Sequence, residues 1–100
     1  MKEVIALARA EFHLLSLYNK LEDIEEGLGD RFDEDFRAAG ERLARHAEIG
    51  PRFAGNIRRL MLLRWHVGMF YVVETNRVVI HAVLDVRQDP QHIRRELGLI

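Results

Sequence analysis

The sequence predicts an α+β fold, a two-layer sandwich of order β-α-α-β-β-β in which a helical hairpin packs on a mainly antiparallel four-stranded sheet. Three observations predict it. Residues 57–86 hold three successive runs rich in β-branched, aromatic and aliphatic side chains, with the polar pair Thr75-Asn76 between the last two. Residues 8–48 follow the helical period of three and four residues. A short apolar run, KEVIAL, precedes them at residues 2–7 and is expected to be the first strand.

Length and composition limit the class of protein. The chain has 100 residues, 48% of them hydrophobic, which fits one folded domain spanning residues 1–100. It has no cysteine, which excludes disulfides, thiolate nucleophiles and Cys-based zinc sites. No apolar stretch reaches the about 18 residues of a membrane span, and the N-terminal run is too short for a signal peptide. We therefore expect a cytoplasmic protein without a membrane partner.

No cofactor is expected from the motifs of the chain. It contains no glycine-rich phosphate loop, Walker pattern or dinucleotide fingerprint. None of its five histidines has another histidine four positions away, so no metal site is expected either.

Two amphipathic helices are predicted from apolar stripes. The first begins at Ala8, and its stripe is Ala10, Leu14, Leu17, Leu21, Ile24 and Leu28. Gly27 is expected to stop this helix, and Asp30 to be the N-cap of the next one. The second stripe is Phe32, Phe36, Ala39 and Leu43, and Gly50-Pro51 ends the helical pattern.

The rest of the chain predicts a meander. Residues 52–56 are expected to be a loop, residues 57–63 a strand, and residues 64–66 a turn. Strands at 67–73 and 78–86 then form a hairpin around Thr75-Asn76, because asparagine tolerates the positive φ that such a turn needs. This turn pairs Val73 with Val78, Val72 with Val79, Tyr71 with Ile80, Phe70 with His81, Met69 with Ala82 and Val67 with Leu84.

This register gives the sheet two apolar faces. The face toward the helices carries Val67, Met69, Tyr71, Val73, Val78, Ile80, Ala82 and Leu84. The outer face carries Phe70, Val72, Val79 and Val83, with His81 among them. Water normally meets a polar face in such a sheet, so the outer face requires a cover. Beyond it, Asp89 and Pro90 are expected to cap and begin a last helical turn with Ile93 and Leu97 on one side.

The two halves of the chain differ in charge. Residues 1–50 hold seven Lys/Arg against twelve Asp/Glu, whereas residues 51–100 hold eight arginines against four Asp/Glu. This asymmetry indicates either an acidic helical layer and a basic sheet layer, or a chance scatter of surface charge.

The order of elements and several stretches resemble the RelE/ParE superfamily of toxins, in particular the ParE-type plasmid-stabilisation toxins. The stretches are ARAEF and LLSLYNKLE in the first helix, GDRFDEDFRAAGERLARHAEIGPR in the second, IRRLML, and above all FYVVETNRVVIHAVLDVRQDP. The resemblance covers nearly the whole chain. It implies a type II toxin–antitoxin module, in which a small toxin is held inactive by a cognate antitoxin that wraps it, and in which no sequence-specific DNA binding is expected without the antitoxin.

The superfamily divides by mechanism. RelE-like members cut messenger RNA on the ribosome, which requires a proton acceptor, a proton donor and cations for the phosphate. Arginines 59, 87 and 94 and histidines 66 and 81 are available, but the chain has no lysine after Lys20 and no tyrosine well placed for this chemistry. The resemblance to ParE-like members implies instead the poisoning of DNA gyrase by protein–protein contact. We favour this reading and expect no catalytic residue.

The alternative is a ribosome-dependent ribonuclease using Arg59, His81 and Arg87, and an inactive member that only binds antitoxin is a weaker possibility. The outer face predicts antitoxin binding by Phe70, Val72, Val79 and Val83. Target contacts are expected from Arg58, Arg59, Trp65, Arg94 and Arg95. Several of these residues also have a plainer, structural interpretation. His81 is then a packed polar residue, Arg87 forms a salt bridge with the capping Asp89, Arg58 and Arg59 are solvated, and Trp65 belongs to the core.

Overall fold

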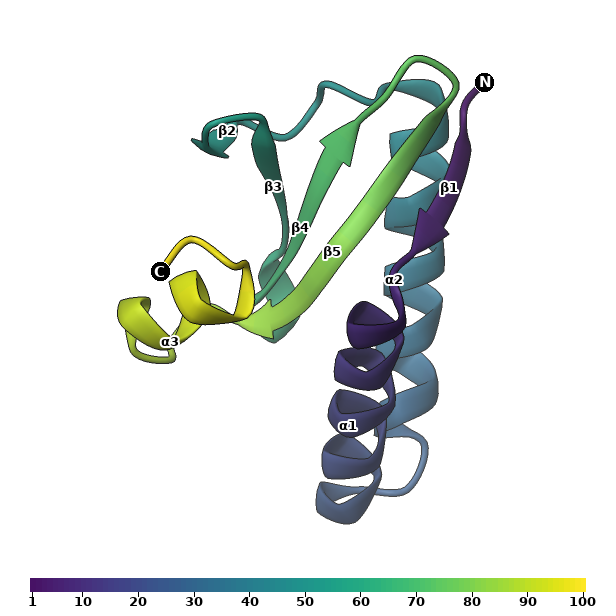
Figure 1. The fold of residues 1–100 in the computed structure, drawn as a ribbon. Coiled ribbons are helices and arrows are strands. Elements are labelled where there is room, and N and C mark those ends of the chain that lie inside the picture. The colour runs from purple at the N-terminus through teal and green to yellow at the C-terminus, as the bar shows by residue number, and fades with distance from the viewer.

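The computed structural model describes all residues, 1–100. The elements follow in the order β1 (Glu3–Ala6), α1 (Ala8–Ile24), α2 (Leu28–Arg45), β2 (Arg52–Ala54), β3 (Ile57–Leu62), a 3-10 turn η1 (Leu63–Trp65), β4 (Val67–Val73), β5 (Arg77–Asp85) and α3 (Pro90–Glu96). Figure 1 shows α1 and α2 side by side against one face of the sheet, with α3 against the other. The predicted α+β class is confirmed, and no helix is long and apolar enough to cross a bilayer.

The sheet has five strands rather than the predicted four, in the order β1-β5-β4-β3-β2. The extra strand is β2, which was expected to be a loop and which pairs antiparallel with β3 across Gly55-Asn56. Gly55 has a φ of 56°, which glycine adopts without a Cβ clash. Three residues are too few to show the alternation that marks a strand, although the Gly-Asn pair is itself a hairpin turn. The remaining pairs are antiparallel except for β1, which runs parallel to β5.

The two long helices form the predicted hairpin, with an earlier start for the second one. Gly27 turns the chain with a φ of 87°, and α2 begins at the next residue. Asp30 therefore lies within the first turn, where it accepts a hydrogen bond from the hydroxyl of Tyr18, and it is not the N-cap. Glu22 of α1 instead accepts hydrogen bonds from the amides of Gly27 and Gly29. Because a residue of α1 satisfies donors at the start of α2, the hairpin is closed by tertiary contact. Ile24, assigned to the core stripe, is 70% exposed.

The β4–β5 hairpin begins in the predicted register and then slips by one residue. Val73 pairs with Val78, Val72 with Val79 and Tyr71 with Ile80, as expected. Beyond them, Phe70 pairs with Ala82, Met69 with Val83 and Val67 with Asp85, so His81 is an extra residue in β5. Such a β-bulge moves every later side chain of the strand to the opposite face. The predicted sides of Ala82, Val83 and Leu84 are therefore wrong.

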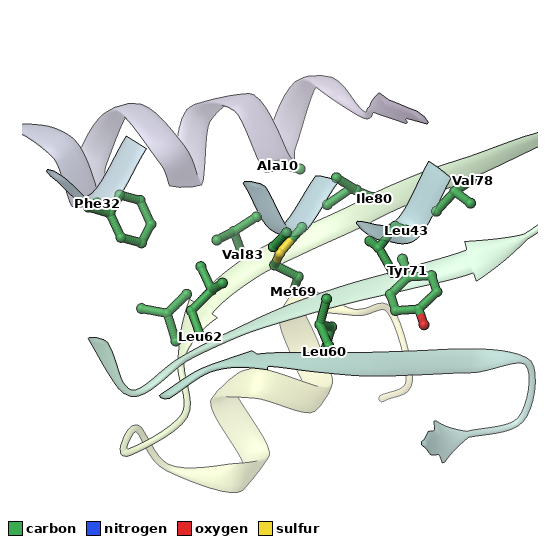
Figure 2. Packing of buried hydrophobic residues seen from close by; sticks show 12 residues of the cluster. Ala10, Phe32, Leu43, Leu60, Leu62, Met69, Tyr71, Val78, Ile80 and Val83 are labelled. Atoms are coloured by element: carbon green, nitrogen blue, oxygen red, sulfur yellow. The ribbon is translucent and has the colours of Figure 1, made fainter. Parts of the chain in front are cut away.

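The main core lies between the sheet and the two long helices. Its buried members are Ala10, Phe32, Ala39, Leu43, Leu60, Leu62, Val67, Met69, Tyr71, Val78, Ile80 and Val83. Figure 2 shows Leu60, Met69 and Tyr71 directed from the strands toward the helices. The hydroxyl of the fully buried Tyr71 accepts a hydrogen bond from the amide of Gly50, 2.9 Å away. This bond fixes the chain where it leaves α2 and enters β2.

A second, smaller core fills the outer face under α3. It consists of Ile57, Phe70, Ala82, Leu84, Ile93 and Leu97. As predicted, Asp89 caps α3 by accepting a hydrogen bond from the amide of Gln91, Pro90 begins the helix, and Ile93 and Leu97 face inward. The cover that the outer face required is thus supplied in part by the chain itself.

Replacement of Asp89 by alanine removes the cap of α3. We expect the free energy of unfolding to fall by about 1 kcal/mol, because an N-cap acceptor is lost from an exposed position. Urea denaturation monitored by circular dichroism measures the change. Asp89→Ser is the matched control, since serine keeps the acceptor, and an equal loss in both variants would refute the capping role.

Candidate functional site

The outer face is not the open apolar surface that the sequence led us to expect. Phe70 has no exposed surface because Ile93 and Leu97 of α3 lie in the same buried cluster. Val83 lies in the main core, on the side of the sheet that faces the long helices. The prediction that it lies on the outer face is wrong. Val79 is 4% exposed, which leaves only the half-buried Val72 of the four expected antitoxin contacts at the surface.

Half of the arginines in residues 51–100 are neutralised within the fold. Four of its eight arginines form ion pairs: Arg58 with Glu48, Arg64 with Asp35, Arg77 with Glu74 and Arg87 with Asp85. The other four, Arg52, Arg59, Arg94 and Arg95, pair with no carboxylate. The uncompensated positive charge is therefore carried by β2, β3 and α3.

Arg58 was expected to contact a target, but its side chain works inside the molecule. It lies on the helix side of β3, and its guanidinium donates hydrogen bonds to the carbonyls of Glu48 and Gly50 at 3.2 and 2.9 Å. Only 16% of its side chain is exposed. Arg58 thus holds the segment between α2 and β2, and it is not part of a basic surface.

Trp65 also has internal partners. Its indole N–H donates to Asp35 of α2 at 2.8 Å, and its ring meets Phe32 edge to face with centroids 5.5 Å apart. The plainer interpretation of Trp65 as a packed residue is supported by these contacts. Trp65 is half-buried and lines a groove of about 320 Å³ between α2 and the β3–β4 turn, beside the 78% exposed Leu63.

Arg59 pairs with Phe70 and lies on the outer face, next to α3. Its guanidinium sits over the ring of Phe53 at 5.5 Å from the centroid, and Phe53 in turn meets Phe70 edge to face. Arg59 and Arg94 of α3 line one cavity of about 250 Å³. Its other walls are Phe53, Val86, Pro90 and Ile93. Arg95, one position further, is exposed.

The three residues of the alternative ribonuclease site do not meet. Nδ1 of His81 lies 3.3 Å from the guanidinium of Arg9 in α1, beyond the end of β1. Burial, and then the nearby Arg9, lowers the pKa of His81, so its ring is neutral at pH 7. Arg87 is bound to Asp85 at 2.7 Å, not to Asp89 as expected, and this hydrogen bond lowers the pKa of Asp85. Arg59 lies two strands from His81, or about 10 Å across the sheet.

A histidine cluster between α1 and α3 was not predicted. Nε2 of His13 lies 3.5 Å from one carboxylate oxygen of Glu96, and Nε2 of His92 lies 3.6 Å from the other. Nδ1 of His13 accepts a hydrogen bond from the amide of Val83. Val83 lies beyond the last residue pair of β1 and β5, Ala6 with Ile80, so β1 does not extend beside it. His92 and Glu96 stand four apart in one helix, but no local pattern connects them to His13. The structure contains no group of three residues arranged to hold a metal ion.

The tautomer of His13 follows from these contacts. Since Nδ1 accepts the Val83 amide proton, the neutral ring carries its own proton on Nε2 and can donate it to Glu96. Burial lowers the pKa of His13, Glu96 acts in the opposite direction, and Arg9 and His92 add smaller lowering effects.

His13 should make the fold less stable in mild acid. Its folded-state pKa lies below the ordinary value of 6.5, so the unfolded chain binds the proton more readily in the window below that value. We expect the free energy of unfolding to fall as pH drops through this window, and His13→Asn, which keeps an acceptor for Val83, to show a shallower fall. Denaturation curves at several pH values measure it. His66→Asn is the control, because His66 is exposed and asparagine tolerates its φ of 55°. Equal slopes in both variants would contradict the assignment.

Comparison with known proteins identifies the fold. No protein-family model matches the chain, and no curated protein matches it in sequence. Among solved structures, a chain of the "Chromosomal ParDE TA system from P. aeruginosa" matches with a TM-score of 0.73 and 18% sequence identity, over 83% of this chain and 94% of that one. A likeness at this identity is a likeness of fold. The fold expected from the sequence is thereby confirmed: this chain shares the fold of a chain of that ParDE system.

Proposed function

We propose that this protein is the toxin of a type II toxin–antitoxin pair, that it acts on DNA gyrase by protein–protein contact, and that a cognate antitoxin neutralises it. The observation that carries the proposal is the match to a chain of a ParDE toxin–antitoxin system, which extends over most of both chains. The function is thus inferred from the fold and from what the surface residues are able to do.

The placement of the polar residues supports contact rather than catalysis. Ribonuclease chemistry requires a proton acceptor and a proton donor within hydrogen-bond reach of one phosphate. Arg59 lies on the outer face, His81 is held by Arg9 at the edge of the sheet, and Arg87 is held by Asp85. Residues in these positions do not act together on one bond, which favours a toxin that works by occupying a surface of its target.

The surface that we assign to the target is formed by three of the four arginines without a carboxylate partner: Arg59, Arg94 and Arg95. Arg58 and Trp65 are left out of it because both have partners inside the fold. For the antitoxin we assign the apolar margin beside it, where Val72 and Phe53 are half-buried. An antitoxin segment lying on this margin would cover the arginines as well, which explains neutralisation by occlusion.

Purified protein should inhibit supercoiling by DNA gyrase or trap cleaved DNA, and it should leave messenger RNA on translating ribosomes intact. The first effect follows from contact with the enzyme, and the second from the separation of the candidate catalytic residues. Addition of the protein encoded beside this one should relieve the inhibition. Ribosome-dependent cleavage of messenger RNA would replace the proposal with the ribonuclease alternative. If the protein neither inhibits gyrase nor causes this cleavage, it is an inactive member of the superfamily.

Substitution of single arginines by alanine should separate folding from action. We expect Arg58→Ala to lose about 1–3 kcal/mol of stability, since it leaves two backbone carbonyls without their charged donor. Arg95→Ala should keep the melting temperature nearly unchanged, because Arg95 is exposed and has no ion pair to lose. Arg59→Ala loses the contact with Phe53, which is worth about 0.5–1 kcal/mol. Both variants should reduce growth inhibition in cells. Thermal melts and growth curves of the three variants measure both. Full toxicity in the variants at 59 and 95 would remove the basic surface from the proposal.

A further inference from the structure

Two arginines of the outer face, Arg59 and Arg94, are half-buried and have no anionic partner. Only three arginines of the chain are half-buried: Arg58, whose partners are internal, Arg59 and Arg94. The side chains of Arg59 and Arg94 take part in no hydrogen bond or ion pair, although both line the cavity of about 250 Å³ under α3. A cation that is partly removed from water without a counter-charge is costly. An anion in this cavity would offset that cost for both arginines at once.

The position of Arg59 is built into the sheet. Its stem lies across β4 at Gly68, where an added Cβ would come within 3.2 Å of Arg59 Cγ and Cδ and 3.0 Å of Val86 Cγ1. Its guanidinium rests on Phe53, and Phe53 rests on Phe70, which is fully buried. Phe70 holds Phe53 in place, and Phe53 holds the guanidinium of Arg59. This guanidinium therefore has a fixed orientation before any ligand binds, which reduces the entropy lost on binding.

The cavity has an apolar lining beside its two charges. Its walls include Phe53, Val86, Pro90 and Ile93. Its volume is below the about 300–1,000 Å³ of sites for drug-sized ligands, so it suits one or two side chains of a peptide. An apolar wall also lowers the local dielectric, which strengthens the attraction between guanidinium and carboxylate.

The surroundings favour a peptide over a nucleic acid. Nucleic-acid sites combine a row of cations along several phosphates with exposed aromatic faces on which bases stack. Here only two arginines converge, and the ring of Phe53 is already occupied by Arg59 and Phe70. Arginine binds a single carboxylate well, in a planar paired geometry.

We propose that the cavity between β2, β3 and α3 binds an acidic–apolar segment of a protein partner, with an Asp or Glu carboxylate held by Arg59 and Arg94 and a neighbouring aliphatic or aromatic side chain placed against Phe53, Val86 and Ile93. This inference rests on the proposed function in that the partner is a protein. It adds the chemistry of the segment that is recognised.

The test uses a set of acetylated tetrapeptides that combine Leu, Ile, Val or Phe with Asp or Glu, together with the same peptides carrying Asn or Gln. Binding to the whole protein is followed by nuclear magnetic resonance, through the amide signals of β2, β3 and α3 and the Nε–H signals of Arg59 and Arg94. We expect acidic peptides to shift these signals and their amide counterparts not to. Arg59→Gln and Arg94→Gln should each weaken binding by about tenfold or more, the value of one charge-assisted hydrogen bond.

Matched variants make the outcome specific. Arg45→Gln removes an exposed charge from α2, on the other face of the sheet, and should leave binding unchanged, whereas Gly68→Ala, which displaces the Arg59 stem, should weaken it. Melting curves show whether each variant is folded, and if Gly68→Ala is not, the pair at 94 and 45 decides. Absence of binding by every acidic peptide up to about 10 mM, where even millimolar Kd values are visible, would overturn the inference. So would equal binding of the amide peptides, or tighter binding of inorganic phosphate or oligouridylate. Gyrase inhibition is measured separately, so either idea can fail alone.

Discussion

The extra residue in β5 is the constraint on which the rest of the structure depends. Because His81 has no partner on β4, the strand changes faces after Ile80. Val83 then completes the core under the long helices, while Ala82 and Leu84 turn outward and give α3 an apolar floor. Without the bulge, the last third of the hairpin would place these residues on the opposite sides, and α3 would lose part of the surface on which it packs.

The docking of α3 determines what the outer face offers to other molecules. It buries Phe70 and reduces a long apolar face to a narrow margin beside a small cavity. Ion pairs across the molecule have a parallel effect on charge, since Glu48 and Asp35 from the acidic half neutralise Arg58 and Arg64. Of the four arginines that remain without a carboxylate, Arg59 and Arg94 line the cavity. The apolar margin and the arginines without partners are therefore neighbours, because α3 covers the rest of the apolar outer face.

This arrangement is suited to recognition. The residues that carry titratable chemistry are tied to structural partners: His81 to Arg9, Arg87 to Asp85, and His13 to the Val83 amide and Glu96. Each such contact stabilises a join between elements and leaves the side chain less free to take part in a reaction. The arginines without partners are the side chains best able to bind an anion. A preorganised guanidinium gains more binding free energy when an anion replaces the water around it.

The sequence by itself determined the order of the elements and each of them except β2 and the short η1. Apolar stripes gave both long helices, Thr75-Asn76 gave the hairpin with its first three pairs, and Asp89-Pro90 gave the start of α3, because periodicity and turn chemistry are local. Only the tertiary structure decided the bulge, the pairing of β2 and the faces of the last strand. Both faces of the hairpin are apolar, so a slip of one residue exchanges one apolar side chain for another and leaves no mark in the pattern. The internal roles of Arg58 and Trp65 and the meeting of His13 with Glu96 join residues far apart in the chain, which local spacing does not encode.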